Sequence, residues 1–414
     1  MKVLFLPTYF HPEQEASSHL SNDREQALVN NGIDIIAYCA TPTRGVSSSM
    51  RLEYKHKKKE LMYDGHLVIY RFRLFREGKN SVQRAFRYIL YSFKQFNRVL
   101  FCKTTKECDV MWISSTPPGR CALISIANKL VKIPIVLNLQ DVFPDSLVGT
   151  GMTRKGSFIW KIGRKIEDFT YRNVDRIIVI SNDFKSNLLK KGVPESKIEV
   201  IYNWVDQNAV IPVKDEDNDL FDEFCVNRNK FRVVYAGNLG NAQNIGIIIE
   251  AAKRLKEKAN NEFVIFGTGG MVDEIKAIKE KEQLDNLKIL PLQPYERVSK
   301  VYGLGNVCIV ACKAGLGGAA MPSKTWSIMS AGRAVLANFD EGELKEIVEN
   351  NGCGVFTKAD DLDGFVNAIE ELAQHPEKCA EMGAKGREFI LNNLTREVGT
   401  SKYVNVIRSV ANKS

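Results

Sequence analysis

A short polar stretch before an apolar segment is the first candidate for chemistry in this sequence. Pro322, Ser323 and Lys324 precede the segment Thr325–Ala331, and Gly332 follows it, which predicts a helix with a defined start and end. Free N–H groups at a helix start, with Lys324 beside them, favour an anion such as a phosphate. Ser323 is expected to cap this helix. The alternative interpretation is an ordinary capped helix in an α/β domain.

Glycine-rich turns follow two predicted strands in the second half of the chain. A strand is predicted over Phe231–Ala236, and Gly237, Asn238 and Gly240 come directly after it. A second turn, Gly267–Gly270, closes the next predicted strand. Glycines between a strand and a helix let the backbone approach a ligand closely. One such turn alone is weak evidence, but this pair lies where an α/β unit binds ligands.

Candidate acid–base residues follow predicted strands in the first half of the chain. Asp141 and Asp145 come after the buried strand Ile135–Leu139, and two carboxylates there suit acid–base chemistry or contacts with sugar hydroxyls. We favour a functional role for Asp141 and a capping role for Asp145. His11 and Glu13 lie in the loop after the first strand, where either a functional site or a solvated loop is expected.

Strands and helices alternate along the chain, which predicts parallel sheets covered by helices. The chain opens with a strand, a helix over Leu20–Asn30 and a second strand over Ile33–Cys39. The polar, acidic segment Val213–Asp222 indicates a boundary. We therefore predict an α/β protein with two doubly wound, Rossmann-like domains, 1–206 and 207–385, facing across a ligand-binding cleft. The polar segment Thr41–Lys59 is expected to be a loop.

A helical stretch from Ser81 to about Cys102 has one apolar and one basic face. The apolar positions are Phe86, Ile89, Phe93, Phe96 and Leu100, and the opposite face carries Arg84, Arg87, Tyr91, Lys94 and Arg98. Two interpretations stay open: a surface helix with its apolar face on the core, or a helix lying on an anionic membrane surface. The second places Arg84, Arg87, Lys94 and Arg98 at the membrane. The formal charge of +9 for the chain is concentrated around this helix, which keeps that interpretation open.

Composition excludes several other classes of protein. No apolar run is long enough for a transmembrane helix, and the apolar start of the chain reads as a strand rather than a signal peptide. The nine cysteines show no C-x-x-C pairing, so we expect reduced, mostly buried thiols. The five histidines have no metal-ligand spacing, so we expect no metal site. Nucleic acid is not expected as a partner, because the aromatic residues among the basic ones lie on the opposite face and form no stacking platform.

Taken together, longer motifs resemble a known enzyme family. The segments Val179–Asp206, Val233–Leu255, VIFGTGG (Val264–Gly270) and MPSKTWSIMSAGRAVLA resemble retaining GT-B glycosyltransferases of family 4, in order and spacing over nearly the whole chain. The segment QDVFPDSL (Gln140–Leu147) and the P-S-K at Ser323 are similar to the branch that makes bacterial surface polysaccharides, including N-acetyl-fucosaminyl transferases. The combination is specific, although each motif alone is not.

The resemblance implies a role for each group of residues. The second domain would bind a UDP-sugar as substrate, without cofactor or metal, and the first would bind a lipid-diphosphate-linked saccharide. The diphosphate contacts would be Gly237, Asn238, Gly240, Gln243, Ser323 and Lys324. The nucleoside pocket would be lined by Gly269 and Pro294, the acceptor side by His11, Glu13 and Asp141, and the catalytic groups would be Asp141 and Lys324. Residues 386–414 would form a helix crossing back to the first domain, and the enzyme would lie in the cytoplasm on the inner face of the membrane.

The chain departs from the family at several positions. The two acidic residues of the usual E-x7-E pair are replaced by Ala319 and Ser327, and the usual basic residues of the phosphate loop by Asn238 and Gln243. Lys324 is then the expected remaining cation at the diphosphate. Two other functions stay open: a UDP-sugar 2-epimerase-like enzyme, which would need no acceptor, and a non-catalytic nucleotide-sugar-binding scaffold.

Overall fold

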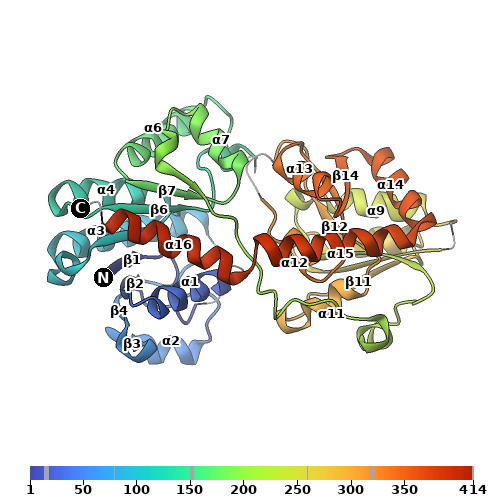
Figure 1. Ribbon diagram of the computed structural model, residues 1–414, viewed down its shortest axis with the longest axis horizontal. Coiled ribbons are helices and arrows are strands. Elements are labelled where there is room, and N and C mark those ends of the chain that lie inside the picture. The colour runs from blue at the N-terminus through green and yellow to red at the C-terminus, as the bar shows by residue number, and fades with distance from the viewer. Residues whose placement is uncertain (14–17, 79, 150–152, 259, 318–320, 413–414) are drawn as a thin grey trace. The chain divides into compact units, whose positions relative to one another are not determined.

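The computed structural model describes residues 1–13, 18–78, 80–149, 153–258, 260–317 and 321–412 and contains two compact units (Figure 1). The first unit combines Met1–Tyr202 with Gly399–Ser414, and the second spans Asn203–Val398. The first boundary lies next to the one expected at residue 206. The C-terminal segment does not separate at residue 386, because helix α15 (Pro376–Asn393) belongs wholly to the second unit.

The first unit is built on an eight-stranded sheet in the order β3-β4-β2-β1-β5-β6-β7-β8. All neighbouring strands are parallel except β3 and β4, which pair antiparallel. The strands are β1 (Lys2–Leu6), β2 (Asp34–Ala40), β3 (Lys59–Met62), β4 (Leu67–Phe72), β5 (Val110–Ser114), β6 (Ile135–Leu139), β7 (Arg176–Val179) and β8 (Ile198–Val200). The central strands are continuous apolar runs, because helices bury both faces of a parallel sheet.

Eight α-helices accompany this sheet in the described part of the unit. They are α1 (Ser18–Asn30), α2 (Ser48–Tyr54), α3 (Ser81–Phe101), α4 (Pro118–Val131), α5 (Asp145–Gly149), α6 (Phe158–Arg172), α7 (Asn182–Lys190) and α16 (Arg396–Ala411). Helix α3 packs on α4, and α4 packs on α6. The expected loop over Thr41–Lys59 is wrong in part, because α2 forms within it. The Ser47 hydroxyl accepts a hydrogen bond from the Met50 N–H and so caps α2.

The part of α16 from Gly399 onward packs on the first unit through an aromatic and polar cluster. The Tyr403 hydroxyl donates to Asn138 Oδ1 at 2.9 Å, at the end of β6. The Arg24 guanidinium lies 5.3 Å from the Trp112 ring and 5.2 Å from the Tyr403 ring. These cation–π contacts join α1, β5 and α16, so the last helix completes the core of the first unit.

The second unit has a six-stranded, fully parallel sheet in the order β11-β10-β9-β12-β13-β14. The strands are β9 (Phe231–Asn238), β10 (Asn261–Thr268), β11 (Leu287–Pro291), β12 (Val307–Ala311), β13 (Ala334–Phe339) and β14 (Gly354–Lys358). The helices are α8 (Leu220–Glu223), α9 (Ile245–Arg254), α10 (Val272–Lys281), α11 (Val298–Gly303), α12 (Lys324–Ser330), α13 (Glu343–Asn350), α14 (Leu362–Gln374) and α15. The core forms where α9 and α14 pack on β9, β10, β12 and β13. Two parallel-sheet units of this kind confirm the predicted fold class.

Candidate active site

The two glycine turns of the second unit lie side by side at the carboxyl edge of its sheet. Strands β9 and β10 are paired so that Gly237 is opposite Gly267 and Asn238 is opposite Thr268. Gly269 has a φ of +153°, and a Cβ there would lie 2.4 Å from the Leu239 carbonyl oxygen. A side chain at Gly269 would therefore collide with backbone, which explains why glycine stands at this position.

Lys324 brings a positive charge to these turns. Its ammonium nitrogen would lie 2.9 Å from a Cβ on Gly237, so the absence of a side chain there makes room for the ammonium. The residue is half-buried, and burial lowers the pKa of the Lys324 ammonium to about 8. A desolvated ammonium beside a glycine turn is a suitable site for an anion such as a diphosphate.

Tyr235 connects the lysine to the first glycine turn, and sequence reasoning missed it. Its hydroxyl donates to the Asn238 carbonyl at 2.8 Å and accepts from Lys324 Nζ at 3.0 Å. Burial raises the pKa of this hydroxyl, so it stays protonated and keeps both hydrogen bonds. A polar tip at an otherwise apolar strand position, three residues before Asn238, is the signal that could have identified it.

The other residues predicted to bind the nucleotide-sugar lie at the same edge of the sheet. Asn238 donates through Nδ2 to Gln243 Oε1 at 3.0 Å, which braces the turn around Gly240. Pro294 is exposed and lies just beyond β11, whose end pairs with Gly267.

The capping role predicted for Ser323 is wrong. Ser323 precedes α12, but its backbone is already helical (φ −59°, ψ −23°) and its side chain makes no cap hydrogen bond. Its exposed hydroxyl is therefore not used to start the helix. Ser327, which replaces one acidic residue of the family's E-x7-E pair, is half-buried on α12, and Ala319 lies outside the described residues.

Two further carboxylates hold the loop after β12 and were not predicted. Asp340 accepts hydrogen bonds from the N–H groups of Gly315 (3.0 Å) and Gly317 (2.7 Å). Asp360 accepts from the Ala314 N–H at 3.3 Å and from Asn244 Nδ2 at 2.8 Å. Each aspartate stands just past the end of a parallel strand, a position that could have marked it.

A cavity of about 260 Å³ lies at the carboxyl edge of the sheet in the first unit. Its lining includes His11, Tyr88, Asn138 and Gln140, together with Glu25 of α1. His11 Nε2 lies 2.7 Å from Glu25 Oε2, and the Glu25 side chain is fully buried. The Ser21 hydroxyl also donates to Glu25 at 3.0 Å. Glu25 therefore fixes the His11 ring at the cavity wall, and it was missed because it looks like an ordinary helix residue in sequence.

Glu13 lines the same cavity, but its carboxylate is used to hold the loop. It accepts hydrogen bonds from the N–H groups of Phe10 (3.2 Å), Thr43 (2.7 Å) and Arg44 (3.0 Å). Burial raises the pKa of Glu13, and these three hydrogen bonds oppose the rise. The structure therefore assigns Glu13 to loop architecture, whereas the His11 ring faces the cavity.

Asp141 lies at the end of β6, as expected, but it lines a different, much smaller cavity from His11 and Glu13. Burial raises the pKa of the Asp141 carboxyl, against hydrogen bonds from Ser146 and the Val142 N–H. The Asp141 residue is nevertheless exposed to solvent, so a ligand can reach it. A carboxyl with a raised pKa at a strand end remains a reasonable proton acceptor.

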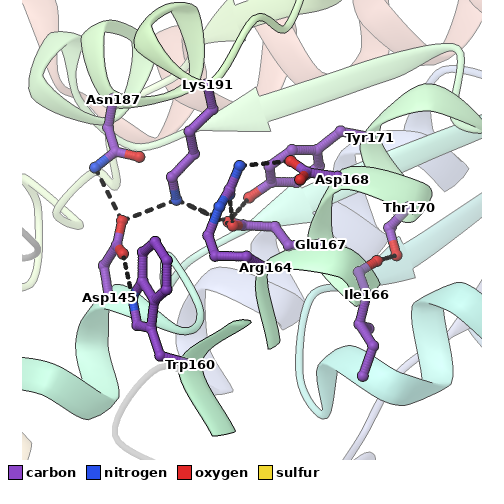
Figure 2. Close-up of polar contacts among 10 residues, drawn as sticks. All are labelled: Asp145, Trp160, Arg164, Ile166, Glu167, Asp168, Thr170, Tyr171, Asn187 and Lys191. Atoms are coloured by element: carbon purple, nitrogen blue, oxygen red, sulfur yellow. Dashed lines mark hydrogen bonds and ion pairs between the residues drawn. The ribbon is translucent and has the colours of Figure 1, made fainter. Parts of the chain in front are cut away.

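Asp145 has an architectural role, but it differs from the capping role favoured from the sequence, because its described partners lie on or next to other helices (Figure 2). It opens α5 and accepts hydrogen bonds from Trp160 Nε1 at 3.3 Å and Asn187 Nδ2 at 3.2 Å. Lys191 Nζ lies 2.8 Å from Asp145 and 3.0 Å from the buried Glu167, so one ammonium bridges two carboxylates. This network ties α5, α6 and α7 together beside β6.

The basic residues predicted to touch a membrane do not share one environment. Arg84 and Lys94 are exposed on α3, and Arg98 is half-buried. The prediction that Arg87 contacts a membrane is wrong, because only 2% of the surface of this residue is exposed. Its guanidinium donates to the Phe75 carbonyl at 3.1 Å and to the Thr43 hydroxyl at 3.0 Å, both inside the first unit.

The described residues contain neither a candidate metal site nor a helix that could span a membrane. No group of three or more His, Cys, Asp or Glu side chains there could hold a metal ion. None of the helices in the described ranges combines the length and apolar character needed to cross a bilayer. All nine cysteines are free, and seven of them are buried.

Each unit matches a family model. Residues 25–209 match Glycosyltransferase Family 4, and residues 217–389 match Glycosyl transferases group 1. The chain is 27% identical over 350 residues to the probable glycosyltransferase WbjE of Pseudomonas aeruginosa, covering 83% of this chain and 82% of WbjE. It is also 27% identical over 285 residues to the putative colanic acid biosynthesis glycosyl transferase WcaI of Escherichia coli K12, covering 68% and 69%.

Solved structures share the fold at low sequence identity. Anabaena Alr3699/HepE in complex with UDP aligns with a TM-score of 0.72 at 15% identity, over 99% of this chain and 100% of that one. Sucrose-phosphate synthase from Thermosynechococcus elongatus aligns with a TM-score of 0.74 at 13% identity, over 100% of both chains. These likenesses establish the architecture.

Proposed function

We propose that this chain, which belongs to the glycosyltransferases with a family 4 domain followed by a group 1 domain, transfers a sugar from a UDP-sugar to a lipid-linked saccharide. Transfer proceeds with retention at the anomeric carbon, the donor carries an N-acetylated sugar, and the product enters bacterial capsule or O-antigen synthesis. The relative WcaI, a putative colanic acid biosynthesis enzyme, supports the polysaccharide setting, and the UDP complex of Alr3699/HepE supports the nucleotide.

The observation that carries this proposal is the position of the Lys324 ammonium. It stands beside the glycine turn at Gly237, hydrogen-bonded to Tyr235, at the carboxyl edge of a parallel sheet where nucleotides bind. Charge develops on the diphosphate as the sugar leaves, and a partly desolvated ammonium stabilises that charge more than it stabilises the ground state. Lys324 is therefore the main electrostatic catalyst, and the backbone N–H groups of the glycine turns supplement it.

The acceptor hydroxyl must lose a proton during transfer. The leaving phosphate oxygen can take that proton, and Asp141 is the alternative acceptor, since its pKa is raised. Retention by this route needs no covalent intermediate of the kind formed by retaining glycosidases. The proposal assigns no metal to the reaction, because Lys324 and the N–H groups neutralise the diphosphate.

The first unit binds the saccharide acceptor in the cavity lined by His11. The ring held by Glu25 and the polar residues Asn138 and Gln140 offer hydrogen bonds to sugar hydroxyls. A lipid-linked acceptor stays in the bilayer, so the enzyme works as a peripheral protein on the inner face of the cell membrane.

UDP release tests the proposal. UDP-N-acetyl sugars are incubated singly with the protein, with and without an extract of lipid-diphosphate-linked saccharides, and free UDP is measured. Release that needs both one donor and the acceptor is the expected result. Conversion of a UDP-sugar to its epimer in the absence of acceptor would show that the protein is an epimerase and not a transferase. Donor binding without release in any combination would favour a nucleotide-sugar-binding scaffold.

A further inference from the structure

Helix α3 buries the face that a surface helix usually exposes. Its polar face is the buried one: the Tyr91 hydroxyl donates to the Pro7 carbonyl at 2.5 Å, and Gln95 Nε2 donates to the Tyr38 carbonyl at 2.6 Å. Arg87 is buried on the same face. Of the two interpretations left open from the sequence, the one with the apolar face on the core is therefore wrong, since Phe86, Ile89 and Phe93 of that face are exposed.

Neighbouring helices expose apolar side chains as well. Of the eighteen large hydrophobic side chains exposed among the described residues, ten lie on α3, α4 and α6. We call them the three-helix apolar surface: Val82, Phe86, Ile89, Phe93 and Phe101 on α3, Ile126 and Leu130 on α4, and Phe158, Ile159 and Ile162 on α6. Phe86 and Ile89 are 56% and 52% exposed, and Leu130 and Phe158 are both 78% exposed.

These side chains belong to adjacent helices. Helix α3 packs on α4, and α4 packs on α6. Between α4 and α6, the ammonium of the exposed Lys129 lies 5.4 Å from the centroid of the Phe169 ring, so the two helices also contact each other through an exposed side chain. Single exposed hydrophobic residues are ordinary, but a group spread over three packed helices marks an interaction surface.

The unpaired charges on these three helices are basic. Helices α3 and α4 contain no acidic residue. The acidic residues of α6 are Glu167 and Asp168, and both pair with Arg164 (Figure 2). Exposed basic residues remain around the apolar side chains, namely Arg84, Lys94, Lys129, Arg154, Lys155, Lys161 and Lys165. Apolar groups ringed by lysine and arginine are complementary to a bilayer with anionic headgroups.

We propose that the three-helix apolar surface inserts into the headgroup region of an anionic lipid bilayer and holds the first unit there. This inference rests on the proposed function and deepens it, because it specifies how the enzyme meets its lipid-linked acceptor. Tyr88 of α3 lines the acceptor cavity, and the next residue, Ile89, belongs to the apolar surface. The cavity and the membrane-facing surface thus meet on one helical turn, so a saccharide can enter the cavity while its lipid stays in the bilayer.

Vesicle co-sedimentation with paired variants tests the inference. The α3 variant is Phe86→Ser with Phe93→Ser, and the α6 variant is Phe158→Ser with Ile159→Ser. The control is Leu52→Ser with Leu61→Ser, which removes two residues of the first unit that are 69% and 59% exposed away from these helices. Each protein is mixed with phosphatidylcholine vesicles, with or without phosphatidylglycerol, and UDP affinity is measured in parallel.

The wild type and the control should bind the phosphatidylglycerol vesicles, more weakly at high salt, and bind pure phosphatidylcholine less. Each test variant should bind roughly tenfold or more weakly, because insertion depends on buried apolar area, with UDP affinity unchanged. An α6 variant that binds like the wild type would overturn the inference. So would a wild type that ignores vesicles but forms a dimer broken by these substitutions, since the surface would then hold a second copy. Failure of the proposed function would appear separately, as absent UDP binding or release.

Discussion

The ammonium nitrogen of Lys324 lies 3.0 Å from the Tyr235 hydroxyl and 4.1 Å from the centroid of the Tyr235 ring. The ring and the hydroxyl thus hold the ammonium at the first glycine turn, although few other groups solvate it. This arrangement explains the lowered pKa, and it leaves the charge free for a ligand. The next three predictions follow from it.

Lys324→Ala should reduce acceptor-dependent UDP release strongly. Removal of the ammonium should cost about 2–4 kcal/mol of transition-state stabilisation, since the leaving diphosphate loses its main cation. Steady-state UDP release measures the effect. The matched control is Lys276→Ala on α10, which removes an exposed lysine and should leave turnover unchanged. Full turnover in Lys324→Ala would contradict the assignment of this residue.

UDP affinity should weaken as the pH rises through about 8, where the Lys324 ammonium loses its proton in the free protein. The charged lysine attracts the diphosphate and the neutral one does not, so binding takes up a proton above that pH. The affinity should fall by up to about tenfold per pH unit there. Calorimetric titration from about pH 7 to about pH 9 measures this slope. The Lys324→Met protein should bind UDP more weakly, and a pH slope equal to that of the wild type in this variant would contradict the prediction.

Lys324→Met should also raise the stability of the second unit at neutral pH. The folded-state pKa of Lys324 lies below the ordinary lysine value, so burial of its charge destabilises the fold below about pH 8 and ceases to do so as the pH rises toward 10.5. Removing the charge should gain about 1–3 kcal/mol at neutral pH. Urea unfolding at two pH values measures this, and an equal gain at both would show that the charge is not its cause.

Glu25→Gln should lower turnover without changing UDP affinity. The carboxylate of Glu25 holds the His11 ring at the cavity wall, and a neutral amide holds it less firmly. Misplacement of a group that positions the acceptor should reduce acceptor-dependent UDP release by roughly tenfold. Gln26→Ala, an exposed change on the same helix, serves as the control. If UDP affinity fell as well, the effect would be one of folding rather than of acceptor binding.

Lys191→Met should destabilise the first unit much more than the adjacent, exposed Lys190→Met. Lys191 bridges Asp145 and the buried Glu167, so its loss leaves two carboxylates poorly compensated (Figure 2). The expected loss is about 2–4 kcal/mol, less than for a fully buried pair, because Arg164 still contacts Glu167. Urea unfolding of both variants compares them. Equal stabilities would show that the network contributes little.

The fold class was predictable from local signals, because parallel strands are local apolar runs and the glycine turns and caps that separate them are local signals too. It also brought Gly237, Asn238, Gly269 and Lys324 to one edge of one sheet, since the carboxyl ends of parallel strands always share an edge. Helix α2 escaped prediction because its segment is polar and short, with little apolar periodicity to reveal it.

Contacts between distant parts of the chain determine which polar side chains are held by the protein and which remain available to a ligand. Glu13 and His11 look equivalent in the sequence, yet three backbone N–H groups take the carboxylate of Glu13, and the buried Glu25 fixes His11. Thr43 and Arg44 lie about thirty residues from Glu13, and Glu25 lies on α1, so no local pattern reveals these partners. Amphipathicity likewise predicts that a helix has two faces but not which face is buried. In α3 the strand-end carbonyls of Pro7 and Tyr38 need donors, and that need turned the polar face inward.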